Sequence, residues 1–428
     1  MQTVEYCYWA IGILVVYLAF LLMQRRYRML LPSVLHTSFW ICTIFLIICQ
    51  LTGHVVSKQV PDSSFNHTAP FVLKMMVASV IGFAAAHVFS ESATVPESHP
   101  TIDANVLEAV LRKFRWLPWF VGVEGLILII FYWSTFGSDL ESFAEYRFMS
   151  ITTKKLGFMG LVQRVSGHVT VLGHMYMILL GYKHGLTGVK MKEFMLYAVL
   201  ISFTNIAIGG RTWVLNAFLP YTISFIYVRT FSEGAKQYTR ADIKRIVVIV
   251  AVCVSLFSVI GILRSGNNYT GKPVDKYLYA TDGSRVTNIV IARFPDGTFQ
   301  HEYGKATLLS NFISSPMRVA WRSSIEDNVG LSVTVPSVMP SLYWDFGSTG
   351  GPVFWGVICF VVELLCLRLM RTSKLLGIIL LGELSYLLFQ SPIGNVFIIN
   401  MPAYEWLLIL WFFRKQIFGN IEGIKPYL

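Results

Sequence analysis

Arginines near the ends of apolar runs are the residues of this sequence best suited to hold a phosphate group. Arg211 follows two glycines at a corner between two apolar runs, and Arg264 ends the run before a long polar segment. Arg318 and Arg322 are four residues apart, so a helix would place both on one face. A guanidinium group binds phosphate oxygens through two hydrogen bonds and stays charged where water is scarce. These four arginines therefore predict a site for a phosphate or pyrophosphate headgroup.

A second interpretation of such arginines stays open, because arginine side chains near a membrane also reach lipid headgroups or pair with acids. It applies most to Arg147 and Arg164, which flank the segment 148–163. It applies less to Arg211 and Arg264, because a Gly-Gly-Arg corner and an arginine at a helix end before a long loop are less usual places for lipid contact.

Three other residues can act as acids or bases. Asp345 lies in the sequence Tyr-Trp-Asp-Phe-Gly before a late apolar run, and both Glu326 and His301 lie in the polar segment ahead of it. A carboxylate or an imidazole there can accept the proton of a sugar hydroxyl group. Two alternatives stay open: Asp345 caps the helix that follows it, and His301 has a structural role. Ionisable residues also fall inside apolar runs, where burial is costly; these are Glu124, His168, His174, Glu363 and Glu383.

Several motifs that would indicate a cofactor are missing from the sequence. It has no GxxxxGK[ST] or GxGxxG motif for a nucleotide, and no Cys/His spacing typical of zinc. The polar loops predicted below to lie outside the cytoplasm contain no Asp-x-Asp pair, which would bind a sugar nucleotide through a metal ion. All six cysteines fall inside apolar runs, which is typical of buried hydrophobic side chains rather than disulfides. We therefore expect no cofactor and no metal ion, so arginine must supply the positive charge of a site.

The composition indicates which elements hold these residues. Of the 428 residues 54% are hydrophobic and 14% are charged, whereas soluble domains have about 25% charged residues. Runs of about 20 apolar residues can cross a bilayer as helices. The sequence thus predicts an all-α, polytopic transmembrane bundle with about eleven spans, in the range of ten to twelve, that forms one integral membrane domain over residues 1–428. The predicted spans are 4–23, 34–56, 70–90, 115–136, 160–181, 192–209, 212–228, 245–264, 346–367, 375–390 and 401–414.

The positions of the basic residues predict the orientation of the bundle. More than half of the 35 Lys and Arg residues lie in six short segments of alternate loops, which are 25–28, 112–115, 183–192, 229–245, 368–374 and 414–425. Such segments stay in the cytoplasm. The net charge of +11 therefore reflects topology and does not indicate nucleic acid. We expect the N-terminus outside, the C-terminus inside, and no cleavable signal peptide.

This orientation places the longest loop, 265–345, outside the cytoplasm. A loop of this length is more typical of a cap over a site than of a tether. Within it, 307–321 alternates apolar and polar residues with a helical period, so we expect short helices in the loop and one along the membrane surface. On the opposite side, the polar stretch 91–111 is expected to end in a short amphipathic helix.

Three segments resemble a known family. The corner Gly209-Gly210-Arg211-Thr212 is similar to a motif of Wzy-type O-antigen polymerases, the bacterial enzymes that polymerise oligosaccharide repeat units. The stretch from Tyr303 to the Pro-Met-Arg that ends at Arg318 resembles their loop element, and Tyr343-x-Asp345-Phe-Gly-x-x-Gly resembles the start of a late span. The resemblance covers about residues 205–370.

The resemblance implies a metal-independent transferase of the membrane glycosyltransferase C class in the bacterial inner membrane, with its active site at the periplasmic face. Such enzymes move the growing glycan from undecaprenyl pyrophosphate to a hydroxyl group of the next undecaprenyl-pyrophosphate-linked repeat unit, in the biosynthesis of O-antigen, lipopolysaccharide or a related surface polysaccharide. The implied partners are this lipid-linked oligosaccharide, membrane lipids and a membrane protein that regulates chain length. The implied pyrophosphate contacts are Arg211, Arg264, Arg318 and Arg322, and Asp345 is implied to orient the acceptor or to act as a base. From their places in the sequence we add Tyr343 as a further glycan contact, and His301 and Glu326 as further candidate catalytic residues.

Two other functions stay open. An O-antigen ligase of the same superfamily also uses arginines and a loop histidine, which His301 would supply. A transporter or flippase is the alternative outside this superfamily. The absence of paired broken helices in corresponding halves, together with one long outer loop, favours an outer active site over a transport path.

Overall fold

The computed structural model of the chain contains helices and turns in the part that it describes, and no strand there. The described residues are 2–27, 35–39, 41, 65–90, 102–137, 157–207, 211–231, 239–265, 287, 290–292, 294–298, 301, 303, 337–372, 374–391, 401–414 and 416–417. Over these ranges the predicted all-α class is confirmed. Most of the predicted 265–345 loop, and 34–56 beyond its first residues, lie outside the described ranges.

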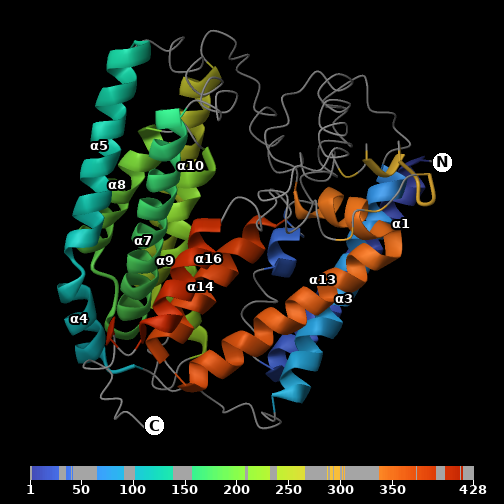
Figure 1. The fold of residues 1–428 in the computed structure, drawn as a ribbon. Helices are drawn as coiled ribbons and strands as arrows, with labels where there is room; N and C mark the ends of the chain where they lie inside the picture. Colours follow the sequence, from blue (N-terminus) through green and yellow to red (C-terminus); the bar gives the residue numbers. More distant parts are fainter. Residues whose placement is uncertain are drawn as a thin grey trace. The chain divides into compact units, whose positions relative to one another are not determined.

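The helices match the apolar runs of the sequence. They are α1 (Gln2–Tyr27), α3 (Phe65–Phe89), α4 (Ala104–Lys113), α5 (Trp116–Phe136), α7 (Gly157–Thr187), α8 (Met191–Ala207), α9 (Arg211–Phe231), α10 (Arg240–Ser265), α13 (Val338–Thr372), α14 (Lys374–Gln390) and α16 (Met401–Phe412) (Figure 1). Each predicted span except 34–56 coincides with one of them. Helix α4 is the predicted amphipathic helix, since Asp103 caps it and Leu107, Val110 and Leu111 are buried.

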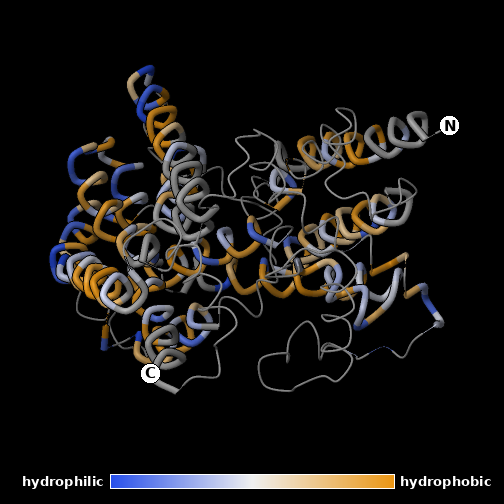
Figure 2. Tube along the Cα trace, turned by 90° about the horizontal axis from the view of Figure 1, so that it is seen from above, coloured by the Kyte–Doolittle hydropathy of each residue, from blue (hydrophilic) through white to orange (hydrophobic). Residues whose placement is uncertain are grey.

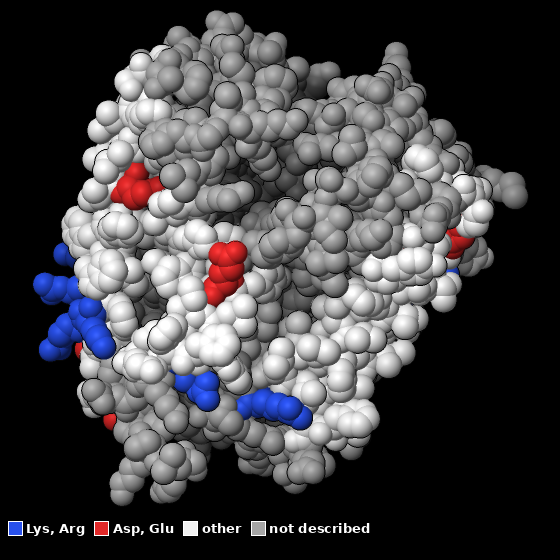
Figure 3. All heavy atoms as spheres, in the orientation of Figure 1, with Lys and Arg blue, Asp and Glu red and all other residues white. Residues whose placement is uncertain are grey.

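Three helical stretches of the described chain are long and apolar enough to cross a membrane, namely Thr68–Phe89, Ala104–Phe131 and Val338–Arg368. Shorter apolar helices cover Ile11–Leu22 and Leu375–Gln390. Figure 2 shows hydrophobic residues recurring along the described helices, and Figure 3 shows few charged side chains on the described surface of one face. The chain therefore has the character of a helical membrane protein, while the number of spans and their orientation stay predictions.

The helix α5 shows why this surface suits lipid. Its large side chains Trp116, Trp119, Ile127 and Ile130 are all more than half exposed in the protein. A row of such side chains in water would be an apolar patch of the kind that soluble monomers avoid. A hydrocarbon phase would remove that cost, so the exposed face of α5 has the composition expected of a lipid-facing surface.

The chain divides into two compact units, which are described separately. The first contains Met1–Val95, Lys272–Arg368 and Leu387–Met401. In it α3 and α13 lie side by side and run in the same direction, because Lys74 contacts Ser348 near their starts and His87 contacts Glu363 toward their ends (Figure 1). Midway, a Cβ atom on Gly82 would overlap the carbonyl oxygen of Gly356, so glycine is what allows the two backbones to approach.

The second unit contains Pro96–Gly271, Leu369–Tyr386 and Pro402–Leu428. Helices α7 and α8 form an antiparallel hairpin, in which Gly173 packs on Ile201 and Lys183 pairs with Glu193. Helices α9 and α10 form another, and Asp242 of α10 lies 3.5 Å from the Arg229 guanidinium of α9. These charged contacts lie at the ends of the helices that the sequence predicts to face the cytoplasm.

Candidate functional site

A kink in α13 organises the candidate site in the first unit. Gly347 has φ of 76° and ψ of −173°, in a region that only glycine adopts readily, and it divides α13 into two helical parts. A Cβ atom at this position would lie 2.8 Å from Asp296 Oδ1 and 3.1 Å from His301 Nε2. The carboxylate and the imidazole therefore both lie against the glycine of the Tyr-Trp-Asp-Phe-Gly motif.

Asp296 caps the helical part that follows the kink. The backbone N–H of Ser348 donates to both carboxylate oxygens of Asp296, at 3.0 and 3.2 Å. A helix start leaves such N–H groups without a partner in the helix, and a carboxylate there is stabilising. The helical part after the kink is thus capped by Asp296, a residue of a Pro-Asp-Gly turn.

The segment that carries Asp296 is fixed to the part of α13 before the kink. The Tyr343 hydroxyl donates to the carbonyl oxygen of Phe294 at 2.8 Å. The Phe294 ring meets Trp344 edge to face, with centroids 5.1 Å apart. The backbone N–H of Tyr303 donates to the carbonyl oxygen of Asp345 at 3.2 Å. These contacts hold residues of the predicted outer loop on the motif at the start of a late span.

His301 has the geometry of a general base. Its Nδ1 lies 3.1 Å from the carbonyl oxygen of Trp344, which can only accept, so Nδ1 carries the proton. In the neutral ring the lone pair then lies on Nε2, the nitrogen beside Gly347. The side chain is partly exposed. This arrangement can take a proton from a hydroxyl group placed at Nε2.

The kink gathers three of the predicted site residues, His301, Tyr343 and Asp345. The side chains of Tyr343 and Asp345 are buried, at 1% and 0% exposure, which suits support of the site better than direct contact with a large substrate. Sequence reasoning missed Asp296, although Pro-Asp-Gly is a turn signal.

Sequence reasoning also missed Lys74. Its Nζ lies 3.5 Å from the carbonyl oxygen of Ser348, just after the kink, and its side chain is exposed. A lysine within an apolar run is a signal in itself, because an ionisable group inside a membrane segment is costly. Lys74 is therefore a cation beside the kink that can attract an anionic group.

The predicted arginine cluster is not assembled by the described residues. Arg211 begins α9 and Arg264 is the penultimate residue of α10, both in the second unit, and their side chains lie outside the described part. Arg318, Arg322 and Glu326 also lie outside the described ranges. Their joint site stays a prediction.

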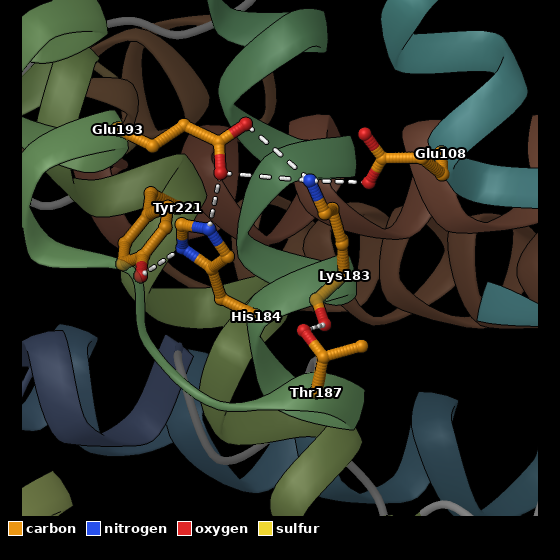
Figure 4. A network of polar contacts seen from close by, with 6 residues as sticks. All are labelled: Glu108, Lys183, His184, Thr187, Glu193 and Tyr221. Atoms are coloured by element: carbon orange, nitrogen blue, oxygen red, sulfur yellow. Dashed lines mark hydrogen bonds and ion pairs between the residues drawn. The ribbon is translucent and has the colours of Figure 1, made fainter. Parts of the chain in front are cut away.

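A second polar cluster lies in the other unit, at one end of α7 (Figure 4). Lys183 is buried, and its Nζ lies 2.6 Å from Glu108 and 3.3 Å from Glu193. His184 donates from Nε2 to Glu193 at 3.2 Å and accepts at Nδ1 from the Tyr221 hydroxyl at 2.9 Å. Burial lowers the pKa of His184, so the ring is neutral. Because these groups satisfy one another across α4, α7, α8 and α9, the cluster fastens four helices.

No family model, curated protein or solved structure matches this chain. The class of protein is therefore defined by fold alone, as an α-helical protein with membrane-spanning character. Any proposal for its activity must therefore be argued from the side chains at the kink of α13 and from the sequence motifs.

Proposed function

We propose that this protein polymerises lipid-linked oligosaccharide repeat units at the periplasmic face of a bacterial inner membrane. The growing glycan leaves undecaprenyl pyrophosphate and joins a hydroxyl group of the next lipid-linked unit. The observation that carries the proposal is the orientation of His301, whose Nδ1 is bonded to Trp344 while its Nε2 lies at the kink of the Tyr-Trp-Asp-Phe-Gly motif. A segment of the predicted outer loop and a motif that resembles the polymerases thus meet at one proton acceptor.

The chemistry assigns a task to each group. His301 Nε2 takes the proton as the acceptor hydroxyl oxygen bonds to the anomeric carbon of the donor sugar. The bond from that carbon to the pyrophosphate oxygen breaks, and undecaprenyl pyrophosphate leaves with the electron pair. The developing negative charge needs cations in a poorly hydrated place. Lys74 lies beside the kink, and Arg211, Arg264 and Arg318 are the further candidates for this role.

The parallel packing of α3 and α13 supports the proposed position of the site. Lys74 lies near the start of α3 and Ser348 lies at the kink near the start of α13, so both helices begin on one side. The basic segments of the sequence predict that this side is the periplasm. Lipid-linked repeat units on the outer leaflet would then reach His301 without crossing the bilayer.

The deciding experiment compares the surface glycans of a deletion strain with those of the parent. A polymerase deletion leaves surface lipid that carries one repeat unit, whereas a ligase deletion leaves surface lipid with none. A normal ladder of chain lengths in the deletion strain would contradict the proposal. The site itself is then tested by complementing the deletion strain with two variants, one at His301 and one at Tyr303.

His301→Asn is the informative variant, because asparagine keeps an N–H donor for the Trp344 carbonyl group but cannot act as a base. We expect it to reach the membrane at normal level and to lose about 10²- to 10⁴-fold in polymerisation rate. Tyr303→Phe is the matched control, since Tyr303 contributes its backbone N–H and exposes 75% of its surface. Full polymer from the asparagine variant would remove His301 from the mechanism.

A further inference from the structure

Helix α7 carries three histidines, and each lies opposite a glutamate of a different helix. The pairs, with their N–O distances, are His168–Glu405 of α16 at 3.3 Å, His174–Glu383 of α14 at 4.0 Å, and His184–Glu193 of α8 at 3.2 Å. The first is well exposed and the third belongs to the fully bonded cluster at the end of α7. The middle pair differs from both because its side chains are buried, at 3% and 1% exposure.

The His174–Glu383 pair is buried without the hydrogen bonds that usually accompany buried charge. Neither carboxylate oxygen of Glu383 has a hydrogen-bond partner, and His174 Nε2 has none either, in the part of the chain that the structure describes. The 4.0 Å between His174 Nδ1 and Glu383 Oε1 is too long for a hydrogen bond. By contrast, the buried His87–Glu363 pair of the other unit is bonded at 2.8 Å.

An ionised carboxylate in such a place is strongly disfavoured, because no donor among the described residues compensates its charge. Glu383 lies in the apolar helix α14, with Leu384 and Leu387 as buried neighbours. The group avoids the penalty by keeping its proton, which makes both it and the neutral imidazole uncharged.

We infer that His174 and Glu383 form a proton-binding site inside the second unit, with the proton held by Glu383. Closing the gap by about 1 Å would bring the two atoms within hydrogen-bond range. The O–H bond of the acid can then break as an N–H bond forms on His174, which leaves a carboxylate and an imidazolium with no change in net charge. The pair can therefore hold one proton in either of two positions, coupled to the distance between α7 and α14.

Few other titratable groups face this pair from the packed helices. The Tyr386 ring lies 5.3 Å from the His174 ring, and Tyr404 of α16 lies close enough to interact electrostatically with Glu383. Both are phenols, which stay neutral over the physiological range. Among the described residues, changes of charge at this place are thus left to His174 and Glu383. This site does not rest on the proposed polymerisation, whose proton acceptor, His301, lies in the other unit.

The test is infrared difference spectroscopy of the purified full-length protein, read at the C=O stretching band of a protonated carboxylic acid. We expect the intensity of one such acid to be lost in Glu383→Gln and to be retained in Glu405→Gln, the control from the exposed pair. The same band should disappear reversibly as the pH is raised. Glu383→Asp keeps an acid and should shift the band, which preserves the assignment if the glutamine variant does not accumulate.

His174→Gln separates the proton site from a fixed ion pair. If Glu383 holds the proton, its band is already present in the unchanged protein and persists in His174→Gln. If the pair is instead a carboxylate with an imidazolium, the band is absent from the unchanged protein and appears only when His174 is replaced. That second pattern would overturn the inference, as would a band that does not respond to pH.

Discussion

Substituting Gly347 by alanine is the sharpest test of how α13 builds the candidate site. The native backbone, with φ of 76° and ψ of −173°, lies in a region essentially confined to glycine. The added Cβ atom would also lie 2.8 Å from Asp296 Oδ1, nearer than a carbon and an oxygen can approach. The variant must therefore change the backbone, displace Asp296, or do both.

The expected cost follows from these two contributions. Holding a residue other than glycine in this backbone region costs about 1–3 kcal/mol. Displacing the Asp296 carboxylate removes the cap on Ser348, which is worth about 1 kcal/mol. Gly347→Ala should thus lower the free energy of unfolding by roughly 2–4 kcal/mol. It should also weaken polymerisation, because His301 Nε2 would lie only 3.1 Å from the new Cβ.

The assay is unfolding of the purified protein in detergent, followed by tryptophan fluorescence. Gly12→Ala is the control, since its Cβ would meet Leu73 at an ordinary 3.6 Å. Asp296→Ala alone should cost about 1 kcal/mol. The double variant should cost less than the sum of the two single changes, because both act on the same cap. A Gly347→Ala protein as stable as the Gly12→Ala protein would refute the kink as a requirement of the fold.

The remaining predictions concern charge, metal, pH and topology. Arg211→Ala, Arg264→Ala and Arg318→Ala should each reduce polymerisation roughly 10²- to 10³-fold at normal protein level, measured on glycan ladders. Lysine at the same position should restore polymerisation only in part. Arg147→Ala should be milder, and equal loss there would point to lipid contact in general. The purified enzyme should keep polymerising in excess EDTA, and loss that magnesium or manganese restores would contradict a metal-independent mechanism. Because burial lowers the pKa of His184, unfolded chains bind a proton at this residue more readily than the folded protein does, so stability should fall through this group as the pH drops below about 6.5 and should not change through it at higher pH. Melting curves should show a shallower acid slope in His184→Gln. Cysteine labelling at position 2 should place the N-terminus outside, and labelling from the cytoplasm would invert the proposed site.

The sequence predicted the helices well because a membrane helix is a local property. A run of about 20 apolar residues satisfies its own backbone hydrogen bonds wherever it lies, so the ranges of α3 and α5 follow from composition. Helix α13 was predicted less well, because it begins at Val338, within the segment predicted as loop, and not at 346. The short helix α4 was predictable for a related reason, since its apolar residues recur with the helical period after Asp103. These features depend on residues that are close in the chain.

The candidate site was predictable only in part. A short motif indicated Tyr343 and Asp345, and its place in the long polar segment before them indicated His301. Neither revealed that Asp296 caps the helix after Gly347, because a Pro-Asp-Gly turn does not specify which helix it will meet.

Pairings between distant helices were decided by the tertiary structure alone. Glu363 bonds to His87, which is 276 residues away in the chain. His174 and Glu383 were each recognisable as costly residues inside apolar runs, but not as partners. The physical reason is that the free-energy cost of burying an ionisable group depends on that residue and its apolar run. Which other group offsets this cost depends on how the helices pack.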